Sequence, residues 1–217
     1  MGKIEPDDDL SESAENYLKA IYRLSSSDTI IKPKTLMEYI PHAPSTVTLI
    51  LQRLAQKGYI EYQKYKGVRL TERGMRRAAR VLRAHRLLEV FFFNFLKLDF
   101  VKVHIEACKA EHVFTSETID NLEIFLNFPK KCPHGNPIPD KELRISILND
   151  TPLISANRGT YYMSRVTYET EQILDMLNKI KLFPGVAMEV IDINKKSNIV
   201  IIKANGKTQM LPFKIAK

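Results

Sequence analysis

Prolines and glycines divide residues 11–70 into short segments, and the order of these segments restricts the fold more than any other feature of the sequence. Apolar residues recur at the 3.6-residue period in the first segment, Pro33 can occupy the first turn of the second, and Gly58 ends the third. The expected elements are helices over Ser11–Leu24, Pro33–Ile40 and from Ser45 to Gly58, then strands over Tyr59–Tyr62 and Val68–Leu70. This order predicts a winged helix-turn-helix, whose third helix enters the major groove of DNA.

Basic residues are concentrated in the same part of the chain. Residues 17–80 hold 13 Lys and Arg against 4 Asp and Glu, whereas the whole 217-residue chain has a formal charge of +8. The remaining residues are therefore close to neutral, and the positive potential belongs to the predicted winged helix. Such a field attracts phosphate backbones, although a solvated basic face without a partner would give the same counts.

The start of the third predicted helix carries small hydroxyl side chains instead of Arg, Asn or Gln. Hydroxyl groups there can bind phosphates or base edges, and an exposed Leu can contact a thymine methyl group. Because few bidentate base contacts are available, part of the specificity should come from DNA shape. The predicted DNA contacts are Ser45, Thr46, Thr48, Leu49 and Arg53 on the helix, with Lys64 and Lys66 in the wing. The alternative is a helix-turn-helix that contacts protein.

Two helices after the wing carry side chains that bind metals. A long helix is expected from Thr71 to about Lys97, and His85 and Glu89 lie one turn apart on it. A further helix over about Phe100–Val113 carries four more candidates. At about 100° per residue these four lie within an arc of about 100°. They are His104, Cys108, Glu111 and His112. Nitrogen, sulfur and oxygen donors on one face suit a transition metal, while Ca²⁺ and Mg²⁺ prefer oxygen alone.

The presence of each of these residues can also be explained without a metal ion. A single His is more often a core or surface residue, Cys108 alone is most often a small buried hydrophobic residue, and Glu111 could simply be solvated. The clustering of three of the five His within residues 85–112 favours metal binding. Two other classes stay open: a DNA-binding metalloenzyme such as a nuclease or hydrolase, and a regulator whose His and Cys residues are structural.

The last third of the sequence has a different character. A helix is expected over Ser116–Asn127, followed by a linker over about Phe128–Asp150, because prolines and a glycine punctuate Cys132–Pro139. A strand, a short helix and several short strands follow. Their expected ranges are Thr160–Tyr168, Glu169–Ile180 and Val186–Pro212, with turns at Asn194 and Asn205-Gly206. The chain is therefore expected to be mainly α, with a small β-barrel-like domain at its end.

Composition excludes several classes of protein. The first ten residues are acidic and do not resemble a signal peptide, and no apolar run is long enough to cross a bilayer. With only Cys108 and Cys132, a disulfide scaffold is not expected. The sequence has no nucleophile elbow and no glycine-rich phosphate loop. We therefore expect a cytoplasmic protein that is not an enzyme and has no membrane partner and no small organic substrate.

Four motifs together resemble the diphtheria toxin repressor family of metal-dependent regulators, in its iron-dependent branch. They are Tyr17–Tyr22 (YLKAIY), His85–Glu89 (HRLLE), Val103–Cys108 (VHIEAC) with Glu111–Val113 (EHV), and Gly135–Pro139 (GNPIP). The resemblance covers nearly the whole chain. It implies a winged helix-turn-helix domain over residues 1–72, a helical dimerisation and metal-binding domain over 73–140, a linker over 141–150 and an SH3-like domain over 151–217.

The resemblance also implies two metal sites. The primary site would use Asn16, Cys108, Glu111 and His112, and the ancillary site would use His85, Glu89, His104, Glu169 and Gln172. Asn16 departs from the family pattern, because iron-type members usually have Met there and manganese-type members Asp. Lys19 replaces an acidic residue of the manganese type. The implied function is a homodimeric repressor of metal homeostasis genes that binds a palindromic operator.

The resemblance and the donor chemistry together favour iron as the cofactor. A soft thiolate such as that of Cys108 suits ferrous iron better than manganese. Fe²⁺ is therefore expected, with Mn²⁺, Co²⁺, Ni²⁺ or Zn²⁺ as substitutes. A manganese-responsive regulator of the same architecture is the alternative.

Overall fold

The computed structural model describes residues 10–25, 30–40, 42–63 and 66–216. Within these ranges the chain forms two compact units. The first unit comprises residues 1–83 with 142–144, and the second comprises 84–141 with 145–217. The boundary falls inside one long helix, Glu72–Asn94.

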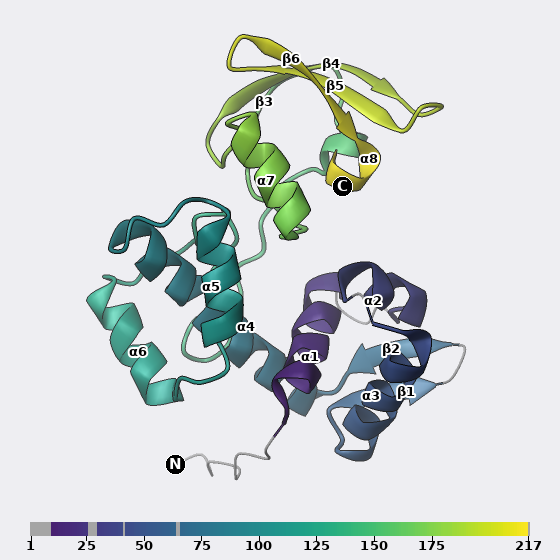
Figure 1. Ribbon diagram of the computed structural model, residues 1–217, viewed down its shortest axis with the longest axis vertical. Helices are drawn as coiled ribbons and strands as arrows, with labels where there is room; N and C mark the ends of the chain where they lie inside the picture. Colours follow the sequence, from purple (N-terminus) through teal and green to yellow (C-terminus); the bar gives the residue numbers. More distant parts are fainter. Residues whose placement is uncertain (1–9, 26–29, 41, 64–65, 217) are drawn as a thin grey trace. The chain divides into compact units, whose positions relative to one another are not determined.

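The first unit has the element order that the sequence predicts (Figure 1). Its elements are α1 (Glu12–Leu24), α2 (Pro33–Tyr39), α3 (Pro44–Gln56), β1 (Ile60–Gln63), β2 (Gly67–Leu70) and the start of α4 (Glu72–Asn94). Ser11 caps α1 by accepting a hydrogen bond from the backbone of Ala14 at 3.3 Å. The expected start of α3 at Ser45 is one residue late, because Pro44 already occupies its first turn. Gly58 follows α3 with a φ of +75°, a conformation that favours glycine.

The three helices enclose a single apolar core. Tyr17, Leu18 and Ile21 on α1 pack with Leu51 and Leu54 on α3, and all five are almost fully buried. β1 and β2 pair antiparallel, as expected for the two strands of a wing. The face of α3 that does not enter the core is left exposed, which a helix that reads DNA requires.

The helices of the second unit carry the predicted metal-binding residues. They are the remainder of α4, α5 (Lys102–Ala110) and α6 (Ser116–Phe125). α5 ends three residues before the expected Val113, since the chain tightens there through a hydrogen bond from Val113 N to Ala110 O at 3.3 Å. The expected linker after α6 is irregular, as predicted, but residues 132–138 are almost entirely buried. Among the described residues, no helix has both the length and the hydropathy to cross a membrane.

The rest of the second unit is a four-stranded antiparallel sheet in the order β3-β4-β5-β6, with two helices and a short 3₁₀ turn (Figure 1). Its elements are η1 (Leu153–Ser155), β3 (Gly159–Tyr162), α7 (Glu171–Lys179), β4 (Ala187–Asn194), β5 (Ile199–Ala204), β6 (Lys207–Pro212) and α8 (Phe213–Ala216). Alternate strand residues such as Val190 and Ile202 face a core shared with α7. The strand expected over Thr160–Tyr168 is shorter, because only its first residues pair with β4.

Two turns of this sheet follow the expected signals. Asn205 and Gly206 adopt φ values of +52° and +75° and join the paired strands β5 and β6. This is the conformation of a tight two-residue hairpin turn. The side chain of Asn194 accepts hydrogen bonds from the backbone of Lys196 and Ser197 at 3.0 and 3.1 Å, which closes the turn between β4 and β5.

α4 approaches β1 so closely that only glycine fits at position 74. A Cβ atom on Gly74 would lie 1.9 Å from the backbone oxygen of Tyr59. Thr71 also holds the two segments together, because its backbone N–H donates to the same oxygen of Tyr59 at 3.0 Å.

We therefore expect Gly74→Ala to lower the free energy of unfolding of the first unit by about 1–3 kcal/mol, as overpacking of a tight contact does. Urea denaturation of the metal-free protein, followed by circular dichroism, measures this change. Met75→Ala on the exposed side of the same turn is the control, with an expected change within about 0.5 kcal/mol. Equal stability of the Gly74→Ala and wild-type proteins would contradict the close approach.

Candidate metal centre and DNA-reading helix

His85 and Glu89 lie one turn apart on α4, with side chains that are fully buried. The Nε2 atom of His85 lies 2.9 Å from Oε1 of Glu89. The prediction that the pair shares one helix face therefore agrees with the structure. A carboxylate and an imidazole without solvent contact are costly to bury unless charges are paired or bound to a metal.

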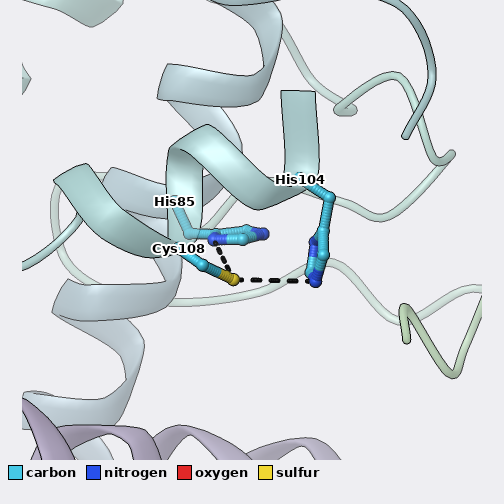
Figure 2. A group of neighbouring side chains, drawn as sticks. All are labelled: His85, His104 and Cys108. Atoms are coloured by element: carbon cyan, nitrogen blue, oxygen red, sulfur yellow. Dashed lines mark hydrogen bonds between the residues drawn. The ribbon is translucent and has the colours of Figure 1, made fainter. Parts of the chain in front are cut away.

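α5 brings two further candidates to the same place. Figure 2 shows the sulfur of Cys108 between the imidazole rings of His85 and His104. The sulfur lies 3.6 Å from Nε2 of His104 and 4.0 Å from Nδ1 of His85. Nδ1 of His104 in turn lies 3.2 Å from Oε1 of Glu89. One residue assigned to the primary site, Cys108, is thus in contact with two residues assigned to the ancillary site.

Glu111 and His112 lie in the turn that follows α5. Glu111 keeps a helical backbone conformation and its side chain is buried. Its Oε2 atom lies 2.6 Å from Nδ1 of His85, and its Oε1 atom lies 3.2 Å from Nε2 of His112. His85 therefore contacts a carboxylate of each predicted site, Glu89 and Glu111, so residues from the two sets share one network of contacts.

Two residues that the sequence analysis did not select, Cys132 and His134, join this network. Nδ1 of His134 lies 3.0 Å from Glu89 Oε1 and 3.7 Å from Glu169 Oε1. Donor atoms of Glu89, Cys132, His134 and Glu169 all lie within 4.8 Å of one another, and all four residues are buried. The prolines around Cys132 indicated only irregular structure. The Cys-x-His spacing inside that segment was the signal that could have identified a ligand pair.

The two candidates from the β-sheet region have different surroundings. Glu169 is 5% exposed and precedes Thr170, the N-cap of α7. It belongs to two groups of potential ligands, one with His85, Glu89 and His104 and one with Cys132 and His134. Gln172 lies in the first turn of α7 and is exposed. The structure therefore brings Glu169 into the cluster, and Gln172 stays a prediction.

The protonation of the cluster depends on Glu89. Burial by itself raises the pKa of this carboxyl group, but the charges of His85 and His134 and hydrogen bonds from His104 and His134 hold it well below its ordinary value. Burial lowers the pKa of His134, but the charges of Glu89 and Glu169 and the hydrogen bonds with Glu89 and Phe100 together leave the pKa raised. Burial raises the pKa of the Cys132 thiol well above its ordinary value, and the charges of Glu89 and Glu169 add to this.

These residues fit a divalent transition metal ion. The donors are carboxylate oxygens, imidazole nitrogens and thiol sulfurs, which together suit iron, manganese, cobalt or zinc. Oε2 of Glu89 is buried and has no hydrogen-bond partner among the described residues, so it has lone pairs available for a cation. A metal ligand must be deprotonated, so an ion bound here would displace protons from the imidazole and thiol groups.

Asn16 belongs to the first unit. It lies in α1, where it is partly buried between the buried residues Glu15 and Tyr17. Oε1 of Glu15 pairs with Nε of Arg77 at 2.5 Å, which ties α1 to the beginning of α4. The role of Asn16 as a metal ligand stays a prediction.

The predicted DNA contacts lie at the start of α3. Ser45, Thr46 and Arg53 are exposed, and Leu49 is 47% exposed although it is apolar. Thr48 is only partly exposed, and its hydroxyl group donates to the backbone oxygen of Pro44 at 2.9 Å. Its hydroxyl can therefore act on DNA mainly as an acceptor. In the wing Lys66 is exposed, and Lys64 lies outside the described residues.

Two adjacent segments of this chain match two families of known protein domains. Residues 9–68 match the family described as "Iron dependent repressor, N-terminal DNA binding domain". Residues 71–140 match the one described as "Iron dependent repressor, metal binding and dimerisation domain".

Relatives and solved structures agree with both matches. The iron-dependent repressor IdeR of Mycobacterium leprae is 25% identical over 221 residues, covering 96% of each chain. The diphtheria toxin repressor of Corynebacterium glutamicum is 26% identical over 208 residues, covering 92% of this chain and 91% of its own.

The structure of the manganese regulator SloR has a TM-score of 0.82 at 29% identity, and it covers 94% of each chain. The crystal structure of T. acidophilum IdeR has a TM-score of 0.79 at 28% identity, over 96% of this chain and 95% of its own. Sequence, fold and buried cluster thus agree, and the chain belongs to the diphtheria toxin repressor family of metal-dependent, DNA-binding repressors.

Proposed function

We propose that this repressor senses ferrous iron and, when loaded, binds a palindromic operator as a homodimer in the cytoplasm. The domains would be those expected from the sequence: residues 1–72 bind DNA, 73–140 bind metal and dimerise, and 151–217 form the SH3-like domain behind a linker over 141–150. The observation that carries this proposal is the buried cluster around Glu89, where three imidazole rings contact one carboxylate.

The primary site would use Cys108, Glu111 and His112 together with Asn16. Asn16 lies on α1, within the unit that contains the DNA-reading helix, whereas the other three belong to the second unit. A bound ion that restrains α1 would lower the entropic cost of binding DNA. By linkage, bound DNA must then raise the affinity for metal by the same factor.

The ancillary site would form around Glu89. We retain His85, His104 and Glu169 from the sequence analysis, keep Gln172 as an untested candidate, and add Cys132 and His134 because their donor atoms lie within 4.8 Å of Glu89. The ion would supply positive charge to a buried cluster of carboxylates. The protein residues would hold it and exclude water from it.

The choice of metal rests on the sulfur donors. Cys108 and Cys132 both lie in groups of potential ligands, and thiolates favour ferrous iron over manganese. Lys19, at the position where manganese-type members have an acidic residue, is buried and only 7% exposed. The competing candidate is a manganese response, which the similarity to the manganese regulator SloR favours.

Exposed aromatic and aliphatic side chains at and just after the ends of α4 and α6 support a homodimer. They are Phe93, Phe95, Leu96, Ile124, Phe125 and Phe128, each between 42% and 59% exposed. The rings of Phe95 and Phe125 lie 4.9 Å apart, so the two helices present one continuous apolar surface. An exposed apolar patch of this kind is typical of a surface that binds another protein.

Operator binding titrated with Fe²⁺, Mn²⁺ and Zn²⁺ in parallel, without oxygen, tests the proposed function. We expect Fe²⁺ to activate binding at a lower free concentration than Mn²⁺, because of the two thiols, and a chelator to reverse the activation. Fluorescence anisotropy of labelled operator measures the response. Activation by Mn²⁺ alone would establish the competing candidate. Cleavage of the DNA would instead indicate a metalloenzyme.

His112→Ala should abolish metal-dependent operator binding while the fold persists. The change removes one ligand of the primary site, and its neighbour Glu111 is then left with fewer buried partners. Mobility shift with and without Fe²⁺ measures the loss, and circular dichroism checks the fold. Lys109→Ala on the exposed side of α5 is the control and should behave as wild type. If metal activated the His112→Ala protein as it does the wild type, His112 would not be needed for metal-dependent operator binding.

Thr46→Ala should weaken operator binding about 3- to 10-fold, as the loss of one hydrogen bond does, without changing the metal affinity measured in the absence of DNA. Thr46 is exposed at the start of α3, where it can contact phosphate or base. Thr208→Ala on the exposed face of β6 is the matched control and should leave both affinities unchanged. A loss of metal affinity in the Thr46→Ala protein would place this residue in a structural role.

A further inference from the structure

The segment Cys132–Pro137, which we call the ligand loop, closes on itself. Cys132 N donates to Asn136 O and Gly135 N donates to Cys132 O, each at 2.9 Å. Lys131 and Pro137 form an isolated antiparallel bridge at its two ends. The loop is thus a compact turn held by its own backbone hydrogen bonds.

The ligand loop packs against residues 164–169, which lead into α7. Val166 N donates to His134 O at 2.9 Å. Gly135 has a φ of +83°, and a Cβ atom on it would lie 2.2 Å from Ser164 O and 2.9 Å from Arg165 Cα. Since the two backbones touch at Gly135, they hold a defined relative position.

Asn136, the residue after Gly135, contacts Glu169 through its side chain. Its Nδ2 atom donates to the backbone oxygen of Val166 at 2.8 Å and to Oε1 of Glu169 at 2.7 Å. The three residues are 4–5% exposed. Both hydrogens of the amide group are therefore used, one on the backbone and one on the carboxylate of a potential metal ligand.

We propose that Asn136 is the positioning residue that holds Glu169 in the metal centre. The amide fixes one oxygen of the carboxylate by a buried hydrogen bond, and its second bond to Val166 prevents the amide from rotating away. This inference rests on the proposed metal-binding function, because it assigns Asn136 a role through Glu169. A purely structural role would require only that Asn136 stabilise the fold.

Metal affinity in the absence of DNA separates these roles. Co²⁺ can serve as the probe, because its absorption spectrum reports thiolate and carboxylate ligation. Hydrogen-bond partners of metal ligands typically change affinity about 10- to 100-fold, so we expect a loss of that size in Asn136→Ala. The control is Asn205→Gly, which also removes an amide that donates two hydrogen bonds, here to the backbone oxygens of Ile180 and Lys181 and near no candidate ligand. Its Co²⁺ affinity should equal that of wild type.

A double-mutant cycle tests whether Asn136 acts through Glu169. In the Glu169→Ala background, Asn136→Ala should cost less than about 3-fold in Co²⁺ affinity, because the carboxylate that it positions is gone. If the two substitutions reduced the Co²⁺ affinity independently, so that the loss in the double mutant equalled the product of the single losses, the proposal would be overturned. Wild-type Co²⁺ affinity in the Asn136→Ala protein would also overturn it. If Asn136→Ala does not fold, Asn136→Ser, which keeps one donor, replaces it in the cycle with the same criteria. A wild-type protein that binds no Co²⁺, Fe²⁺ or Mn²⁺ would overturn the proposed function itself.

Discussion

The second unit of this protein is organised around a carboxylate that has no contact with solvent. Glu89 is fully buried on α4, and rings of His85, His104 and His134 lie within 3.2 Å of its Oε1 atom. A buried charge is tolerated only when it is paired or bound to a cation. The histidines supply part of that compensation. The remaining demand for positive charge is the physical reason to expect a metal ion here.

Segments far apart in the sequence meet at this carboxylate. α4 and α5 supply side chains from regular helices, where the helical period sets their direction. The ligand loop and Glu169 come from irregular backbone, so other contacts must set theirs. The close approach at Gly135 and the two hydrogen bonds of Asn136 provide such contacts. A centre assembled in this way depends on loop packing as much as on the identity of its ligands.

Local patterns predicted some of these features and not others. The winged helix was predictable because Pro33 and Gly58 act through their own backbone restrictions. The pairing of His85 with Glu89 was predictable because the 3.6-residue period places them on one face. Cys132 and His134 were not found, because no period relates a side chain in an irregular loop to a helix.

The sequence by itself determined the order of elements, the basic first third and the candidate ligands on helices, since each follows from short-range geometry or composition. The tertiary structure decided that Cys132 and His134 join Glu89, that Glu169 enters the cluster, and that His85 links the two predicted sites. These contacts join residues separated by up to about eighty positions. Only the packing of one segment on another specifies them, because loop conformation and burial are properties of the folded chain as a whole.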